Sequence, residues 1–164
     1  MANRKMKKKF MQIAIKEAHM AIRRNDGGPF GAVIVRKGKQ VAKAHNEVIG
    51  SNDPTSHAEI LAIRRASRKL RRFNLSDCEI YTTCEPCPMC LGAILWARIP
   101  RVYFGCRKED TVRIGFDDKA FYDVMRDAIR GKYSKSSLKT IEIGRKQCLE
   151  LFKIWAEKKD KILY

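Results

Sequence analysis

No stretch of this 164-residue sequence is apolar for long enough to cross a membrane. The longest segment without a charged side chain, Pro86 to Ala97, has only 12 residues, whereas a spanning helix needs about 20. The basic N-terminal stretch has neither a sustained apolar segment nor a small-residue cleavage motif, so it does not resemble a secretory signal. We therefore expect a cytoplasmic protein with no membrane partner.

Internal repeats, low-complexity tracts and linkers rich in proline or serine are also absent from the sequence. Its length is close to the roughly 150 residues typical of one domain, so we expect residues 1–164 to fold as a single domain. Apolar residues make up 45% of the chain, enough for a core without disulfide bonds. The six cysteines are then more typical of thiols or metal ligands than of a disulfide framework.

Acidic residues are scarce, with 18 Asp and Glu against 35 Lys and Arg, and the formal net charge is +17. Such an excess attracts polyanions, including RNA. The cations follow the outer faces of the expected helices, apart from one dense run from Arg4 to Lys9. We therefore favour an ordinary solvated surface over nucleic-acid binding.

Hydrophobic periodicity predicts alternating helices and strands in the order αββαβαβαβα. The expected helices cover residues 8–24, 56–70, 86–97, 116–130 and 145–158, and the expected strands cover residues 30–35, 40–46, 79–83, 101–106 and 139–143. The first two strands read as a hairpin, whereas the later strands need helical crossovers. This order predicts an α/β fold with a mixed sheet covered by helices on both faces.

Three residues have the spacing of metal ligands. His57 lies at the start of one expected helix, and Cys87 and Cys90 lie at the start of another, 30 residues later. Cysteines three positions apart at a helix start project from the same end, where the helix dipole favours their thiolate forms. One imidazole and two thiolates suit zinc and leave its fourth tetrahedral position open. The spacing therefore predicts one catalytic zinc ion per chain.

Glu59, two residues after His57, supplies a proton carrier beside this metal site. Zinc lowers the pKa of a bound water to about 7, and a nearby carboxylate that stays off the metal can act as general base and then acid. A His-x-Glu motif combined with Pro-Cys-x-x-Cys is the known signature of zinc deaminases. The chemistry that this predicts is replacement of a ring amino group by oxygen, with release of ammonia.

Two simpler explanations exist for the cysteines. Cys87 and Cys90 alone are also the pattern of a thioredoxin-like redox pair. Cys84, three residues before Cys87, could supply a fourth ligand and make a structural zinc site. The separate His57-Ala58-Glu59 motif favours a catalytic site over both.

Together these motifs resemble the cytidine and deoxycytidylate deaminase superfamily, and most closely its small bacterial zinc-dependent guanine deaminases. The similar segments are Gly27–Val35, Ser51–Thr55, His57–Glu59, Cys84–Ile94 and Gly115–Asp118, together with Tyr164. The zinc motifs mark the superfamily, and the last two elements narrow the substrate. The resemblance implies a three-layer α/β/α cytidine deaminase-like fold with a central five-stranded mixed sheet.

The resemblance also implies roles for individual residues. Zinc binds to His57, Cys87 and Cys90, Glu59 moves protons, and Asp118 helps the amine to leave. Substrate binding falls to Asn46, Phe30, Ala58 and Tyr164, and Tyr164 closes the pocket of a partner subunit in a domain-swapped homodimer. Without the resemblance, Asn46 would be interpreted as a turn residue and Phe30 as a core residue, and Asp118 could equally cap a helix.

The activity implied is hydrolytic deamination of guanine to xanthine and ammonia, a step of purine metabolism that uses a purine base and water. The alternative is a tRNA-specific adenosine deaminase that forms inosine, which shares the zinc motif and would explain the charge of +17. Pro88, Gly115–Asp118 and Tyr164 favour the guanine enzymes. Other nucleobases or nucleosides remain alternatives, as does a nucleic-acid-binding or redox module without turnover, against which the intact Glu59 argues.

Overall fold

The computed structural model describes residues 2–116, 119–130, 141–160 and 162, and the chain divides into two compact units, Met1–Asp117 and Asp118–Tyr164. The first unit contains α1 (Ala2–Arg24), β1 (Gly31–Arg36), β2 (Lys39–His45), α2 (Val48–Ser51), α3 (Ala58–Leu70), β3 (Cys78–Cys84), α4 (Pro88–Trp96), β4 (Val102–Cys106) and α5 (Lys108–Val112). The second unit contains α6 (Lys119–Ile129) and α7 (Arg145–Glu157). The expected elements are confirmed except for one strand, and the short helices α2 and α5 are additional.

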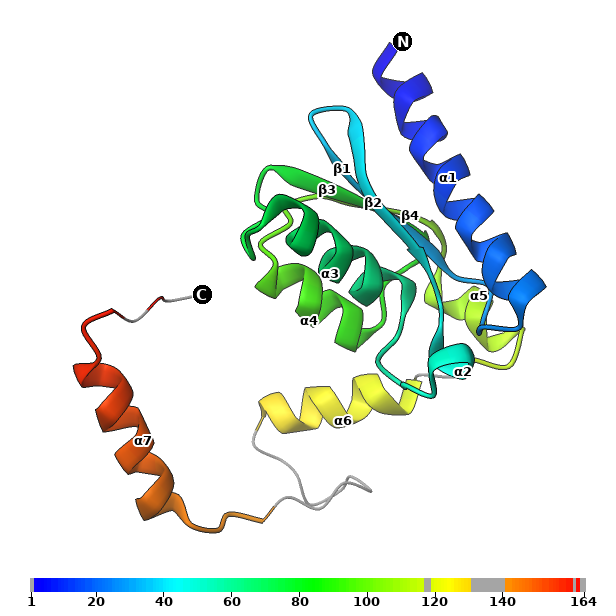
Figure 1. Ribbon diagram of the computed structural model, residues 1–164. Helices are drawn as coiled ribbons and strands as arrows, with labels where there is room; N and C mark the ends of the chain where they lie inside the picture. The colour runs from blue at the N-terminus through cyan, green and yellow to red at the C-terminus, as the bar shows by residue number, and fades with distance from the viewer. Residues whose placement is uncertain (1, 117–118, 131–140, 161, 163–164) are drawn as a thin grey trace. The chain divides into compact units, whose positions relative to one another are not determined.

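The described strands form one mixed sheet in the order β2-β1-β3-β4 (Figure 1). Strand β1 is antiparallel to both β2 and β3, whereas β3 and β4 are parallel. The β1–β2 hairpin turns at Lys37 and Gly38, which both have positive φ values, 48° and 70°, as the tight hairpin turns with a favourable twist require. Helix α4 forms the crossover between the parallel strands.

The expectation of a fifth strand over residues 139–143 is wrong, because the described sheet has four strands. Ile141 and Ile143 lie in irregular chain and are 83% and 86% exposed, while residues 139 and 140 lie outside the described part. Alternation of Ile with Glu142 is compatible with a strand, but strand geometry needs a neighbouring ladder to satisfy its backbone groups. None of the described residues of the second unit forms such a neighbour.

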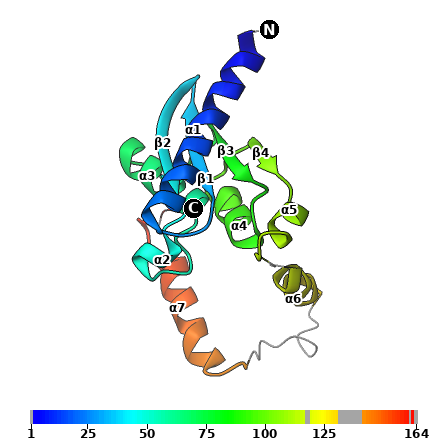
Figure 2. The same ribbon diagram turned by 90° about the vertical axis from the view of Figure 1, so that its right-hand side faces the viewer.

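Helices cover both faces of the sheet, which confirms the three-layer arrangement (Figure 1, Figure 2). Val33 and Val35 of β1 pack with Phe10 and Ala14 of α1 on one face. The alternate strand residues face a second core cluster, which contains buried side chains of α3 and α4. Helices α3 and α4 also contact each other on this face of the sheet (Figure 1).

Among the described residues, no helix is both long enough and apolar enough to cross a membrane.

Candidate active site

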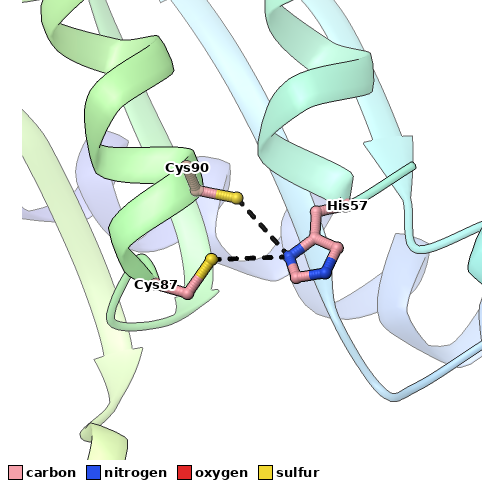
Figure 3. A group of neighbouring side chains, drawn as sticks. All are labelled: His57, Cys87 and Cys90. Atoms are coloured by element: carbon pink, nitrogen blue, oxygen red, sulfur yellow. Dashed lines mark hydrogen bonds between the residues drawn. The ribbon is translucent and has the colours of Figure 1, made fainter. Parts of the chain in front are cut away.

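The three expected metal ligands come together at the first turns of α3 and α4. His57 and Cys87 are the residues immediately before these helices, and both have extended backbones, with φ and ψ of −70° and 152° for His57 and −64° and 168° for Cys87. Pro88 then begins α4, a position where its missing N–H is not needed. The helix starts therefore present His57, Cys87 and Cys90 to one point, as Figure 3 shows.

The distances within this group suit a tetrahedral zinc ion. The Nδ1 atom of His57 lies 3.7 Å from the Sγ atom of Cys87 and 3.5 Å from that of Cys90 (Figure 3). Zinc bonds of about 2.0 Å to nitrogen and about 2.3 Å to sulfur at the tetrahedral angle place these atoms about 3.5 Å apart. All three ligand atoms lie within 4.8 Å of one another. The side chains thus already have the spacing that the ion needs.

A fourth protein ligand from Cys84 is not part of this group. The Cys84 thiol instead donates a long hydrogen bond of 3.8 Å to the carbonyl oxygen of Arg107, and burial raises its pKa to about 12. A neutral Cys84 thiol that is directed at the Arg107 carbonyl does not occupy the fourth position of the metal site. The arrangement therefore favours an open, catalytic position over a structural zinc site.

The two ligand thiols have opposite charge preferences before a metal binds. A hydrogen bond from Cys90 lowers the pKa of the Cys87 thiol to about 4, and a hydrogen bond with His57 acts in the same direction. Hydrogen bonding to Cys87, burial and the charge of Glu59 raise the pKa of the Cys90 thiol. A divalent cation between the two sulfurs would offset the repulsion that keeps Cys90 protonated. The chemistry of His57, Cys87 and Cys90 therefore fits a bound divalent cation.

Glu59 lies in the first turn of α3, only 5% exposed, with its carboxylate directed at the metal group. Its Oε2 atom is 3.4 Å from the Sγ atom of Cys90, and its Oε1 atom accepts a hydrogen bond of 2.7 Å from the Thr82 hydroxyl. Burial raises the pKa of the Glu59 carboxyl group, and the Thr82 hydrogen bond partly opposes that shift. The geometry provides a desolvated, oriented carboxyl group beside the sulfurs.

A cavity of about 530 Å³ opens next to His57. Its lining consists of Ile22, Asn25, Gly27, Gly28, Phe30, Asn46, Val48, Ile49, Pro54, His57 and Phe116. Most of these residues are apolar, and a small number of polar groups within an apolar cavity is typical of a site for a small organic ligand. The cavity is therefore a pocket beside the metal group, of suitable size for a heterocyclic base.

Two of the expected substrate-binding residues, Phe30 and Asn46, lie in this lining, side by side at the open end of the β1–β2 hairpin, where the Asn46 N–H donates a hydrogen bond of 3.0 Å to the Phe30 carbonyl oxygen. Asn46 is 4% exposed, and its Oδ1 atom accepts a hydrogen bond of 3.2 Å from the Val48 N–H. Phe30 meets Phe116 edge to face, with ring centroids 5.2 Å apart. Ala58, a third expected residue, is fully buried as the first residue of α3 and does not line the cavity.

The remaining two expected residues, Asp118 and Tyr164, lie outside the described residues. Sequence reasoning in turn missed Thr82 and Phe116. Thr82 is identified only by the register of β3, which turns it towards α3. Phe116 has a signal in the sequence, since it lies within the Gly115–Asp118 segment, but its packing on Phe30 needs the folded chain.

Comparison with known proteins agrees with this site. Residues 4–106 match the family described as the cytidine and deoxycytidylate deaminase zinc-binding region. The chain belongs to this family of zinc-binding deaminases. The matched residues include the whole metal group and Glu59, so the family's metal and the donor set seen here agree.

Individual relatives carry two kinds of name. A Bacillus subtilis protein named guanine deaminase is 49% identical over 113 residues, which cover 69% of this chain and 72% of the relative. An Aquifex aeolicus protein named tRNA-specific adenosine deaminase is 45% identical over 98 residues, which cover 60% of this chain and 64% of the relative. The deaminase family is therefore shown, while its members here differ in substrate.

Individual solved structures match different shares of the chain. The X-ray structure of guanine deaminase from Bacillus subtilis aligns with a TM-score of 0.88 at 38% identity, covering 96% of this chain and 98% of that chain. A structure from work on A-to-I editing by tRNA:A34 deaminases aligns with a TM-score of 0.59 at 42% identity, covering 61% of this chain and 76% of that chain. Similarity to the guanine deaminase thus extends over almost the whole chain.

Proposed function

We propose that this protein is a zinc-dependent guanine deaminase, which hydrolyses guanine to xanthine and ammonia. The observation that carries the proposal is the extent of structural similarity, 96% of the chain at a TM-score of 0.88 for the guanine deaminase against 61% at 0.59 for the tRNA-type structure. Likeness beyond the zinc-binding region is informative because the two groups share that region. The proposed reaction converts one purine base, guanine, into another, xanthine.

The cavity supports a planar heterocycle as substrate. Phe30 and Phe116 supply aromatic surface on which a purine ring can pack, and aromatic contacts of this kind prefer offset or edge-on geometry. Asn46 supplies an amide with both donor and acceptor atoms, which suits the edge of a base. Its Oδ1 atom is oriented by the Val48 N–H, so the amide is held in one orientation before substrate binds.

Within this proposal His57, Cys87 and Cys90 hold zinc, which supplies Lewis-acid activation of water when bound. Glu59 accepts a proton from the water as its oxygen bonds to C2 of guanine, and it delivers that proton to the adjacent ring nitrogen. The proton of the new C2 hydroxyl group then passes to the amino group, the bond from C2 to that nitrogen breaks, and ammonia leaves while the hydroxyl oxygen becomes the C2 carbonyl of xanthine. Thr82 keeps the Glu59 carboxylate aimed at the reacting atoms through its 2.7 Å hydrogen bond.

The C-terminal unit has a separate part in the proposal. We propose that residues 1–164 act as one deaminase domain, that the chains form a homodimer, and that Tyr164 of one chain closes the pocket of the other. Asp118 would assist the departing amine. Support comes from α7, where Leu151, Phe152 and Ile154 are each more than 60% exposed, since such apolar faces are typical of interaction sites. Sedimentation velocity on the purified chain would test the dimer.

A cytoplasmic location also belongs to the proposal. All six cysteines are free in the structure, which suits a reducing compartment.

The direct test supplies guanine to the purified zinc-loaded protein and measures xanthine and ammonia. The Glu59→Gln variant is the control, because it keeps the size of the side chain and one oxygen that can accept the Thr82 hydrogen bond but cannot carry the proton. We expect turnover by the wild-type protein and a loss of at least about 100-fold in the variant, the usual contribution of a general acid-base group. Absence of guanine turnover by the wild-type chain would refute the proposal.

The second candidate is adenosine deamination in tRNA, favoured by the net charge of +17 and by the relatives named for that activity. The same preparation should therefore be offered tRNA, adenosine, cytosine and guanosine in parallel. Inosine formation in tRNA without guanine turnover would replace guanine as the substrate, while the shared zinc chemistry would stand.

A further inference from the structure

The outward face of α1 carries a row of six exposed polar side chains, four of which are Lys or Arg. Positions on this face recur every third or fourth residue, as helical geometry requires, and all are exposed. We call this row the α1 basic stripe; it consists of Lys5, Lys9, Gln12, Lys16, His19 and Arg23. Lys8 lies beside it and is also exposed. From Lys5 to Arg23 the stripe is about 27 Å long at 1.5 Å per residue.

No carboxylate balances the stripe from its own helix. Glu17 is the single acidic residue of α1, and it is only 7% exposed. Its Oε1 atom pairs with the Lys43 ammonium group at 2.8 Å, and its Oε2 atom lies 3.6 Å from the His45 ring. Among the described residues, no ion pair within 4.0 Å involves Lys5, Lys9 or Lys16. The positive charge of the stripe therefore faces solvent uncompensated.

The α1 basic stripe borders a hollow in the protein surface. This hollow of about 550 Å³ lies along the C-terminal half of the stripe, between α1 and β2. Its lining consists of Lys16, Glu17, His19, Met20, Arg23 and Lys43. Cations stand on the α1 side of this hollow, whereas Lys43 on the β2 side is already paired with the buried Glu17 carboxylate, so the cations of α1 supply the uncompensated positive charge.

We propose that the α1 basic stripe and its hollow bind the phosphodiester backbone of a nucleic acid. The Lys and Arg residues of the stripe recur every four to seven residues without exposed acids between them, which suits a chain of phosphates, because each neutralised phosphate releases counterions. A protein partner would need an apolar centre, which the stripe lacks. An anionic membrane would need an apolar helix face, and that face of α1 is already packed against the sheet through Phe10 and Ala14.

Most of this surface lies away from the deaminase centre, and only its end at Arg23 comes near, because the neighbouring Ile22 lines the cavity beside His57. Helix α1 covers one face of the sheet, whereas α3 and α4, whose first turns carry the metal group, pack on the other (Figure 1). A nucleic acid on the stripe would thus be a bound partner and not a substrate in the cavity. The inference goes beyond the proposed function and does not depend on which base is deaminated.

The test measures binding of the full-length, zinc-loaded protein to a labelled single-stranded RNA 20-mer and to a duplex of the same length by fluorescence anisotropy. The variant carries Lys5→Gln, Lys9→Gln, Lys16→Gln and Arg23→Gln. The matched control removes four exposed cations elsewhere, with Arg68→Gln, Lys108→Gln, Lys146→Gln and Lys159→Gln. Both variants have the same net charge, so a difference between them reports position.

Each lost phosphate contact reduces the slope of log affinity against log salt by about 0.7 for a single strand and about 0.9 for a duplex. We therefore expect the stripe variant to lose about 3 from the slope between 50 and 200 mM salt and at least about tenfold in affinity at 100 mM. The control variant should lose clearly less. Circular dichroism melting of both variants checks that they fold.

Three results would overturn the proposal. Equal weakening in both variants would mean attraction to the overall charge with no site on α1. Equally tight binding of polyglutamate of matched length would mean that phosphodiester is not recognised. Binding to phosphatidylserine vesicles in place of RNA would assign the stripe to a membrane surface. Guanine turnover, measured on the same samples, should be the same in the stripe variant as in the wild type, so a failure of the proposed function would be seen separately.

Discussion

Replacement of Thr82 by valine tests how Glu59 is tuned. Valine has nearly the shape of threonine but lacks the hydroxyl that donates to the Glu59 Oε1 atom at 2.7 Å. Thr82 is fully buried and Glu59 is 5% exposed, so water cannot easily replace the lost hydrogen bond. The bond stabilises the charged carboxylate, and its loss therefore raises the pKa of Glu59 further above its ordinary value.

The size of the effect follows from the strength of the bond. A hydrogen bond to a charged group contributes about 1.5 to 3 kcal/mol, and 1.36 kcal/mol corresponds to one pKa unit. If the whole of this energy acts on the carboxylate form, the pKa rises by about 1 to 2 units. A base that protonates at higher pH loses activity at higher pH, so the acid limb of the pH profile should move upwards by the same amount.

The assay is the pH dependence of kcat/KM for guanine in wild-type, Thr82→Val and Thr82→Ser proteins, each checked for zinc content. The serine variant keeps the hydroxyl, and we expect its acid limb to stay close to that of the wild type. A valine variant with an unchanged limb and normal zinc content would refute the reasoning, because the hydroxyl would then have no influence on the proton carrier.

Three further predictions use matched pairs of variants. Gly28→Ala should raise KM more than it lowers kcat, because the new Cβ would lie 2.7 Å from the Phe30 ring and 2.8 Å from the Phe116 ring. Gly92→Ala, whose Cβ would have nothing within 4 Å, should leave KM unchanged. Steady-state kinetics of both variants would check this, and equal effects on KM would contradict it. His45→Ala should cost about 2 kcal/mol of unfolding free energy by urea denaturation, because it removes the partly buried 2.8 Å hydrogen bond between the His45 ring and the Asp26 carboxylate, while exposed His19→Ala should cost almost nothing. Chelation should remove one zinc ion per chain, abolish activity and lower the melting temperature; metal analysis showing no zinc in active protein would contradict this expectation.

The sequence predicts the fold well where local patterns decide it. The β1–β2 hairpin follows from two apolar segments around Lys37 and Gly38, and the helix starts follow from the motifs that they carry. The strand expected over residues 139–143 fails because alternation of side chains does not create a partner strand. Helices α2 and α5 have only four and five residues, too short for a periodic signal.

In the candidate site too, some residues are predictable from the sequence and others are recognised only in the folded chain. Its metal group was predictable because the ligands lie in short motifs whose residue types are informative by themselves. Thr82 was not, because one threonine among several has no distinguishing neighbours in the sequence. Its position beside Glu59 arises only when β3 pairs with β1, where Thr82 lies opposite Ala32.

That pairing links the core to the chemistry. Side chains of a strand alternate between faces, and on β3 the buried Tyr81 packs with α1 whereas Ile80 and Thr82 face α3 and α4. A slip of one residue in the register of β3 would place Tyr81 against Glu59 and turn Thr82 towards α1. The apolar residues that hold the register, Val33 opposite Tyr81 and Ile34 opposite Ile80, therefore also hold the proton carrier in place. Substitutions in this part of the core should affect catalysis before they unfold the protein.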